Sequence, residues 1–494
     1  MRRSFVVAAF ALVHGAAAQQ IQDVWQTTWD KASLLASTPP ASAIAFGTPG
    51  TAAAADIQID DTQVYQTIQG FGATLTDSSA KLLDGLKTAN SDEYWKLMDY
   101  MFNITDGANS ASLSYVRVPL GASDFSTSVY SFDDTAGDTG LTSFNIDASP
   151  SYLFSTLTDI LSVNSAVRFH LVPWSPPAWM KTPANADGGS LNDADVNSYA
   201  QYIVDALTGF QGKNIPVFAV GIQNEPENSD TTYPSTSMPV ATEAAVGEAL
   251  RPLMNSAGFT DVKLIGYEHN WDHASAYPVQ LMQAAESSFD GVSFHCYEGT
   301  YEEQANFTSQ YPDKEVYFTE CTGTLGSDWW TDIKWNLDNI MIGAIEYGAS
   351  SGLMWNLALD GSGQPILPGS DSCTGGCRGV VTINSDGTWS ANQELYSLGQ
   401  AAKAIIPKDP NGPWGQRIGV TVAGSNSWAL RVGAYKTGRA SSSDPSRWAL
   451  VVLNWDDSSS TTFNPVAVDA TIEFQGKQAA YTFPVGVTTL WWFA

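Results

Sequence analysis

Two glutamates, Glu225 and Glu320, stand at the ends of apolar runs of the chain. The run PVFAVGI leads into QNEPEN, which contains Glu225, and the run EVYFT leads to Glu320. A carboxylate at the end of a buried strand costs free energy unless it has a partner or a function. One such glutamate is explained as readily by a structural ion pair or a capping contact. Two of them in equivalent positions indicate a site.

Two inward carboxylates without a cluster of metal ligands suit the cleavage of a bond between sugars. One must donate a proton to the leaving oxygen, and the other must be ionised to attack the anomeric carbon; in sites that retain configuration they lie about 5–5.5 Å apart. A shared site of low dielectric separates their pKa values. We therefore expect an apolar setting that keeps Glu225 protonated, with Pro226 ending the strand behind it. Asn224 is placed to hydrogen-bond the sugar hydroxyl beside the reacting carbon.

Other residues at the strand ends support a sugar site. Six aromatic residues lie at or just past the ends of apolar runs: Trp174, Trp179, Tyr267, Trp271, Tyr297 and Trp355. Sugars present apolar C–H faces that stack on such rings, although some of these rings can equally cap a core. Arg117, Asp124 and His295 also fall at strand ends, where the ordinary role of such an Arg or His is to hold a carboxylate in place.

The elements that position these residues form a regular series. Eight apolar runs lie at 69–77, 112–124, 167–179, 216–226, 261–269, 291–298, 315–323 and 351–360. Stretches with helical spacing lie between most of them, at 91–102, 149–163, 192–210, 242–258 and 327–348. This alternation indicates a parallel sheet buried on both faces. A doubly wound open sheet is the alternative, but eight units favour an α/β fold of the (β/α)8 TIM-barrel type, whose strand ends meet at one mouth.

The chain after about residue 403 has a different pattern. Its short apolar runs are broken by Gly, Asn, Asp and Ser, which is typical of an antiparallel β-sandwich. We predict a catalytic barrel at 65–402 and a C-terminal β-sandwich at 403–494, with an N-terminal segment at 19–64 that contributes to the sandwich.

Charge and the N-terminal sequence predict the compartment and the class of partner. Residues 1–18 have two arginines, an apolar middle and small residues at the end, as in a secretory signal peptide. No later run is apolar and long enough to span a bilayer. The 51 acidic and 23 basic residues give a net charge of −28, which opposes binding to nucleic acid or an anionic membrane. We expect a secreted, extracellular monomer that acts on a neutral substrate and carries glycosylation sequons at Asn103 and Asn306.

The four cysteines fit an oxidising compartment. Cys373 and Cys377 lie in a Gly-rich loop, DSCTGGCRG, and we expect them to form a disulfide. Their spacing could also serve a metal, but no His or second Cys pair accompanies them, so we expect neither a metal nor a cofactor. Cys296 and Cys321 follow two apolar strands and form either a second bridge or two buried thiols.

Seven segments, taken together, resemble one known family. They are GFGATLTDSSA, RVPLGASDFS, VPWSPPAWMK, GIQNEPEN, SFHCYEG, VYFTECTG and LMWNLALD. In this order and spacing they resemble glycoside hydrolase family 30, and SLGQAAKAIIPKDPNG at 397–412 extends the likeness. The resemblance runs from about residue 60 to the end. The NEP motif alone recurs in many barrel glycosidases, whereas all seven segments together are highly specific.

The resemblance implies a (β/α)8 barrel with a side β-sandwich, and hydrolysis with retention of configuration. Carried over to this sequence, it implies that Glu225 is the acid/base, Glu320 the nucleophile and Asn224 the partner of the 2-hydroxyl. The residues that match positions around the scissile bond are Arg117, Asp124, Trp179, His295, Tyr297 and Trp355.

The substrate is the least constrained part of the resemblance. The family includes glucosylceramidases, xylanases and fungal endo-β-1,6-glucanases, and the motifs look most like the last. A flexible β-1,6-glucan suits a short cleft, which we expect Trp179, Tyr267, Trp271 and Tyr297 to wall. The polar 271–278 and 360–380 segments argue against a lipid substrate. A xylanase, a glucosylceramidase and a catalytically silent carbohydrate-binding protein remain alternatives, although a silent protein would be expected to have lost one glutamate.

Overall fold

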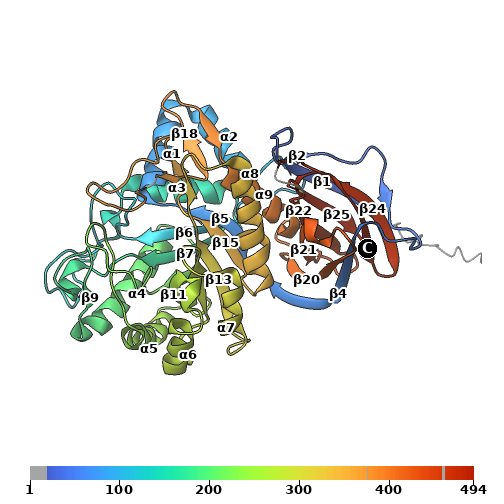
Figure 1. Cartoon of the computed structure of the whole chain (residues 1–494). Helices are drawn as coiled ribbons and strands as arrows, with labels where there is room; N and C mark the ends of the chain where they lie inside the picture. Colours follow the sequence, from blue (N-terminus) through green and yellow to red (C-terminus); the bar gives the residue numbers. More distant parts are fainter. Residues whose placement is uncertain (1–18, 375, 459–461) are drawn as a thin grey trace, which may run out of the picture.

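The computed structural model describes residues 19–374, 376–458 and 462–494, and Figure 1 shows a barrel beside a sheet-rich body. The predicted signal peptide at 1–18 lies outside the described residues. Within them, no helix combines the length and the apolar character needed to cross a bilayer.

Eight parallel strands form the barrel in chain order. They are β5 (Gly70–Thr74), β6 (Tyr115–Leu120), β7 (Arg168–Pro173), β10 (Val217–Gly221), β11 (Lys263–Asn270), β12 (Gly291–His295), β13 (Glu315–Glu320) and β15 (Ser351–Met354). Each corresponds to one of the eight apolar runs, so the predicted TIM barrel is confirmed. β15 pairs with β5, and a bridge between Val316 and Ala349 links β13 to the approach of β15, which nearly closes the barrel.

Helices follow the barrel strands and bury one apolar face each against them. They are α1 (Asp77–Ala89), α2 (Ser91–Phe102), α3 (Ser151–Val163), α4 (Val196–Gly212), α5 (Val240–Ser256), α6 (Tyr277–Ala285), α7 (Gln304–Thr308) and α8 (Trp329–Trp335), which continues as a π-helix over Asn336–Ala344. Short strands lie in the loops: β8 (Lys181–Thr182), β9 (Ser190–Leu191), β14 (Gly323–Thr324), β16 (Ala358–Leu359), β17 (Cys377–Arg378), β18 (Val381–Ile383) and β19 (Trp389–Ala391).

The interior of the barrel is layered. One layer is apolar and fully buried, and consists of Tyr115, Ala219, Ile265, Tyr317 and Leu353. Two residues further along β6 and β13 lie Arg117 and Thr319, because alternate residues of a strand point to the same face. Below the mouth of the barrel lies a polar layer that contains Arg117 and Thr319, and below that lies the apolar layer.

Strands from both ends of the chain form the second body. They are β1 (Gln20–Thr28), β2 (Ala36–Ser37), β3 (Ile44–Ala45), β4 (Ala55–Thr67), β20 (Gln416–Ala423), β21 (Leu430–Thr437), β22 (Arg447–Asn454), β23 (Val468–Phe474), β24 (Lys477–Phe483) and β25 (Gly486–Phe493). The pairs are antiparallel except for β4 with β23. Trp448 and Trp492 pack on Phe474 with ring centroids 5.2 Å apart, so the strands enclose a core of their own.

Helix α9 (Gln393–Ile405) lies between the two bodies (Figure 1). All of its residues are buried, and it contacts β5 of the barrel as well as β22 and β25. Gln400 hydrogen-bonds both Thr27 of β1 and Thr489 of β25. The expected domain boundaries at 64/65 and 402/403 stay predictions, and β4 and α9 run across them.

Candidate active site

A cavity of about 300 Å³ opens at the carboxyl ends of the barrel strands, and both candidate glutamates line it. One oxygen of Glu225 and one of Glu320 lie within 4.8 Å of each other. The other residues of the wall are Asp124, Trp174, Asn224, Tyr233, Tyr297, Thr322, Thr324, Trp355, Ser372, Cys373, Gly376 and Cys377. The barrel thus brings together two carboxylates that are 95 residues apart in the sequence.

Glu320 is held by a donor on each of its carboxylate oxygens. Arg117 donates from Nη1 to Oε2, and the hydroxyl of Tyr297 donates to Oε1 at 2.8 Å. Arg117 is fully buried, so its charge is concentrated on the few acceptors around it. A guanidinium and a hydroxyl, one on each oxygen, fix the orientation of this carboxylate toward the cavity.

Asn224 shares the same arginine. Nη2 of Arg117 donates to Oδ1 of Asn224 at 2.6 Å, which fixes the orientation of the amide. The amide Nδ2 has no partner among the described residues, and Asn224 lines the cavity. An N–H donor is therefore available for an oxygen of a bound sugar.

Glu225 reaches the cavity from a left-handed turn. Its φ is +47°, and its backbone N–H donates to the carbonyl of Glu268 at 3.0 Å. The carboxylate Oε1 lies 3.1 Å from Nδ1 of His295, and Oε2 accepts from Nδ2 of Asn228 at 3.2 Å. A non-glycine residue in this conformation is costly, and such strain is typical of functional positions.

The surroundings of Glu225 are not apolar, which corrects the expectation from the sequence. Burial has the largest effect and raises its pKa, but the hydrogen bond from His295 and the charges of His269 and His295 together lower that pKa to about 2. For His295, burial is opposed by the charge of Glu320, by the hydrogen bond to Glu225 and by the carboxylate of Glu268 at 3.9 Å, and its pKa is raised to about 8. The 3.1 Å contact lets the two groups share one proton, and the opposite directions of their pKa shifts favour the imidazole as its holder.

Glu268 is a candidate site residue that the sequence did not single out. It is fully buried in β11, and its carboxylate lies 3.1 Å from Nη2 of Arg117 and 2.6 Å from Nε2 of His170. Burial raises the pKa of Glu268, but its interactions with His170 and Arg117 outweigh burial and hold that pKa well below the usual value. Gly221 leaves the space for it, since a Cβ there would lie 2.8 Å from Oε1 of Glu268. The signal was available, because Glu268 also stands near the end of an apolar run.

Asp124 is a third carboxyl on the cavity wall. It is buried, and burial together with the charges of Glu320 and Glu225 raises its pKa to about 7 against the hydrogen bond from Ser372. The Ser372 hydroxyl donates to Oδ2 at 2.6 Å, while Oδ1 has no partner among the described residues. Asp124 can therefore engage a sugar hydroxyl, as expected. Ser372 comes from a loop for which the sequence offered no signal.

Three of the predicted aromatic residues, Trp174, Tyr297 and Trp355, lie on the cavity wall. Trp355 stacks on Trp174 with ring centroids 5.2 Å apart, and the guanidinium of Arg117 lies 4.8 Å from the Trp174 ring. Tyr297 is 42% exposed and is the one wall aromatic that also faces a neighbouring cavity.

The structure corrects the placement of Tyr267 and Trp271, which were expected to wall the cleft. Tyr267 is fully buried and donates to the carbonyl of Asn270 at 2.6 Å. Trp271 is 1% exposed, packs on Phe318 and donates to Gln304 at 2.8 Å. Both rings belong to the core and cannot touch a substrate in this conformation.

A bulge in β11 is the physical reason. The register of β11 against β12 shifts between Gly266 and His269, and Tyr267 and Glu268 have φ values of +71° and +48°. One extra residue reverses the alternation of side chains beyond it. Glu268 therefore points into the barrel and Tyr267 away from it. Glu243 of α5 accepts the freed N–H of Tyr267 at 3.0 Å.

Three other predicted residues do not line the cavity that holds the glutamates. Trp179 donates to the carbonyl of Asp133 and lines a separate cavity of about 310 Å³. Arg117 and His295 are fully buried behind Glu320 and Glu225. They act on the chemistry through these carboxylates rather than by touching sugar.

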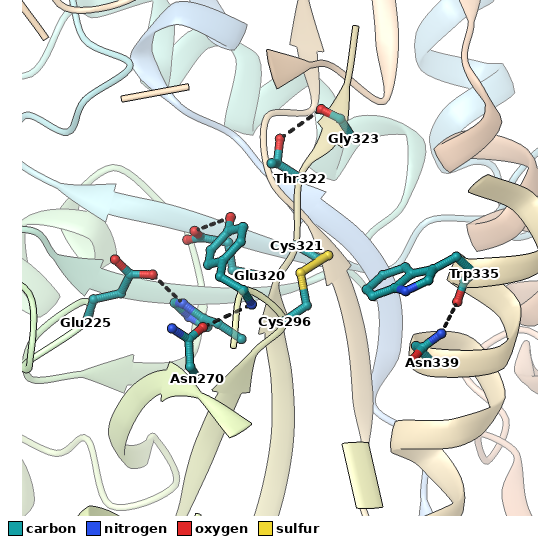
Figure 2. The surroundings of a disulfide bond; sticks show 11 residues. Glu225, Asn270, Cys296, Glu320, Cys321, Thr322, Gly323, Trp335 and Asn339 are labelled. Atoms are coloured by element: carbon teal, nitrogen blue, oxygen red, sulfur yellow. Dashed lines mark hydrogen bonds and ion pairs between the residues drawn. A yellow bond between two sulfur atoms is a disulfide. The ribbon is translucent and has the colours of Figure 1, made fainter. Parts of the chain in front are cut away.

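Both pairs of cysteines are joined. Cys373 and Cys377 form the predicted disulfide in a loop that lines the cavity. Cys296 and Cys321, which the sequence left open, form a second disulfide. Figure 2 shows this bridge beside Glu320, with Asn270 and Glu225 to its left. It links the residues that directly follow His295 and Glu320, and so ties together β12 and β13 at the site.

Two further expectations concern modification and metals. Asn306 is exposed on α7, and Asn103 is partly exposed, so their glycosylation stays a prediction. Glu225, His295 and Glu320 offer ligand atoms within 4.8 Å of one another, a spacing that a metal ion could use. Both oxygens of Glu320 already accept hydrogen bonds from Arg117 and Tyr297, however, which makes this group a poor cation site.

Known sequences that resemble this chain are glycoside hydrolases. The model of the glycosyl hydrolase family 30 TIM-barrel domain matches residues 68–366. The chain is 31% identical over 407 residues to an endo-1,6-beta-D-glucanase of Neurospora crassa, covering 78% of this chain and 79% of that protein. It is 30% identical over 379 residues to endo-1,6-beta-D-glucanase BGN16.3 of Trichoderma harzianum, covering 72% and 73%. A putative glucosylceramidase of Caenorhabditis elegans is 28% identical over 283 residues, about half of each chain.

Solved structures agree with the sequence matches. The endo-beta1,6-glucanase BT3312 superposes with a TM-score of 0.81 at 25% identity, covering 96% of this chain and 99% of that one. The catalytic domain of a family 30 xylanase from Talaromyces cellulolyticus, at 19% identity and a TM-score of 0.65, shares the fold.

Proposed function

This chain belongs to glycoside hydrolase family 30, and from that premise we propose that it is a secreted, retaining glucanase that cleaves β-1,6-glucan internally. The observation that carries the proposal is the pair Glu225 and Glu320, with oxygens within 4.8 Å at the base of one cavity. The two fungal relatives and BT3312, all endo-1,6-glucanases, support the linkage.

The spacing of the carboxylates supports retention of configuration. An inverting enzyme leaves room for a water between its carboxyl groups, which are then roughly 6.5–9.5 Å apart. Here the gap between the nearest oxygens is too small for that arrangement. Direct attack by one carboxylate on the sugar fits the geometry better than attack by an intervening water.

The first step would form a glycosyl ester on Glu320. Its ionised oxygen, aimed by Arg117 and Tyr297, attacks the anomeric carbon while the bond to the leaving oxygen breaks. The proton that His295 and Glu225 share passes through Glu225 to that oxygen, so the leaving sugar departs with a hydroxyl group. Asn224 donates to the 2-hydroxyl, where hydrogen bonds strengthen in the transition state.

The second step would release the sugar. Water attacks the anomeric carbon on the face that the leaving group vacated, and the bond to Glu320 breaks. Glu225, now a carboxylate, takes the proton of the water, and His295 restores the shared-proton pair. Two inversions at one carbon give the β configuration that the substrate had.

The substrate and the location rest on further observations. The net charge of −28 suits a neutral polymer, and the cavity that holds both glutamates is small, about 300 Å³. Two disulfides are typical of proteins that fold in an oxidising compartment, which supports secretion.

Product analysis tests the proposal. Pustulan, a β-1,6-glucan, should give short gentiooligosaccharides whose new reducing ends are first formed as the β anomer. Laminarin, xylan and glucosylceramide are assayed in parallel. Release of xylooligosaccharides with pustulan untouched would overturn the glucanase assignment and leave the fold and the catalytic pair standing.

A further inference from the structure

A second cavity adjoins the first on the far side of Glu225. It measures about 370 Å³, and Glu225 and Tyr297 line both cavities. Its remaining walls are Glu227, Asn228, His269, Asn270, Asp272, His273 and Glu298. Glu320, Asn224 and Asp124 line the first cavity and not the second.

The second cavity holds a polar group that lacks a partner. Asn270 is 9% exposed, and its Oδ1 accepts the N–H of Tyr297 at 3.0 Å, which fixes the orientation of the amide. Its Nδ2 makes no hydrogen bond to the described residues, and Asn270 lines the cavity, so an N–H donor is available for a ligand there. Figure 2 shows Asn270 below and to the right of Glu225.

An oriented carboxylate lies at the mouth of the same cavity. Glu227 accepts from Nδ1 of His273 at 2.8 Å, and Nδ1 of His269 lies 3.9 Å from the same oxygen. The hydrogen bond to Glu227 raises the pKa of His273. The ring of Tyr297 is the one aromatic surface, so a ligand here would be recognised chiefly by hydrogen bonds.

We propose that this second cavity binds the sugar unit that leaves, with Asn270 and Glu227 recognising its ring hydroxyls. The inference rests on the proposed function. The attacked carbon must lie beside Glu320 in the first cavity, and the oxygen that receives the proton must lie beside Glu225. The leaving sugar then lies beyond Glu225, where the second cavity is.

The position also fits the linkage. In a β-1,6 bond the leaving oxygen sits on an exocyclic carbon, so the departing ring stands one bond further from the cleavage point. Two cavities that meet at Glu225 can each accept one ring. The same site must serve in reverse, when the 6-hydroxyl of an acceptor attacks the glycosyl ester, gives its proton to Glu225 and displaces Glu320.

Transfer to an acceptor isolates this cavity from the first. β-Gentiobiosyl fluoride and β-xylobiosyl fluoride serve as donors, because a fluoride leaving group needs no sugar beyond Glu225. Gentiobiose, xylobiose and glucose serve as acceptors, and the ratio of transfer to hydrolysis is measured. Glu227→Gln and Asn270→Asp, which keeps the acceptor for Tyr297, are compared with Glu248→Gln, an exposed glutamate on α5.

We expect both cavity variants to lower the transfer ratio about ten-fold and to lose more activity on glucan than on the fluoride, while Glu248→Gln matches the wild type. An unchanged ratio, or an equal loss on glucan and fluoride, would overturn the inference. Failure of the proposed function has a different signature. The xylobiosyl donor, or transfer to a secondary hydroxyl, would then be preferred, and the cavity variants would still lower the ratio.

Discussion

In the proposed mechanism each catalytic step depends on a different side chain. Glu320→Ala should abolish turnover, because it removes the proposed nucleophile. Without the nucleophile we expect turnover on pustulan to fall by at least about 10⁴-fold. Azide should restore some activity and give the α-configured glycosyl azide, because one inversion replaces two. Product configuration is read by NMR. Ordinary activity in Glu320→Ala would refute the assignment.

Glu225→Ala should behave differently from Glu320→Ala. An activated aryl glycoside needs little protonation, so ester formation persists and its breakdown becomes slow, which a burst of aryl alcohol reveals. Azide should then accelerate turnover and give the β product. Absence of both the burst and the rescue would contradict the acid/base role.

The shared proton predicts the pH dependence. Because the pKa of His295 is raised to about 8, the pair keeps its proton until the pH rises through that value, and activity should fall above it. In His295→Gln the effect of burial on Glu225 is no longer opposed by the imidazole, so the alkaline limb of kcat/KM should move to lower pH. An alkaline limb that stays in place would exclude the pair as the proton source.

Glu268→Gln tests whether the buried carboxylate positions both catalytic glutamates. It removes the charge that faces Arg117 and His170, and we expect kcat to fall about 100-fold with little change in KM, and the free energy of unfolding to fall by about 3 kcal/mol. Glu243→Gln is the matched control. Glu243 is also buried, but its pKa is raised to about 7, so a neutral amide resembles it more closely. If kcat fell equally in both variants, Glu268 would contribute to stability but not to the positioning of the two glutamates.

At the scale of elements, the sequence predicted the barrel strands well and the bulge not at all. Each strand is a continuous apolar run between polar ends, a local signal that burial on both faces requires. The rule that a carboxylate at such an end marks a site singled out Glu225 and Glu320, which line one cavity. The corresponding rule for aromatic residues failed for Tyr267 and Trp271. The bulge in β11 that turns these two rings away depends on contacts with α5 and β12 that are remote in sequence.

The residues that the loops contribute to the cavity could not be predicted from the sequence either. Ser372, Tyr233 and Thr324 come to the cavity through tertiary folding of segments without periodic patterns. The pairing of Cys373 with Cys377 could be predicted because the two are neighbours. The pairing of Cys296 with Cys321 needed the adjacency of β12 and β13.

The disulfide between Cys296 and Cys321 should stabilise the site side of the barrel. It closes a loop between residues 25 apart, and loops of this size contribute about 3 kcal/mol by chain entropy. We expect Cys296→Ser/Cys321→Ser to lower the free energy of urea unfolding by about that amount and to reduce kcat. The bridge between Cys373 and Cys377 closes a much smaller loop, which lies on the cavity wall. We therefore expect Cys373→Ser/Cys377→Ser chiefly to raise KM. The reverse pattern would contradict these roles.

On the scale of the whole molecule, α9 makes the barrel and the sheet-rich body interdependent. The helix is buried on all sides, and Lys403 at its end donates to the carbonyl of Ala108 in the barrel. We expect a chain truncated to residues 65–402 to be insoluble, because it exposes the face of α9 that β22 and β25 cover. Solubility and circular dichroism of the truncated and full chains check this. A soluble truncated barrel with full activity would contradict it.

The antiparallel pairing of β1 with β25 has a consequence for synthesis. A ribosome makes residues 20–28 long before their partners at 486–493, so β1 must wait until the barrel and the other strands of its sheet have been made. During that interval its ladder groups have no native partner, and the barrel strands emerge before the body that covers α9 exists. A stop codon before residue 486 would therefore leave β1 without its partner strand as well as removing β25. In a cell, such truncated products are candidates for capture by chaperones and for degradation, because an unpaired strand edge promotes aggregation.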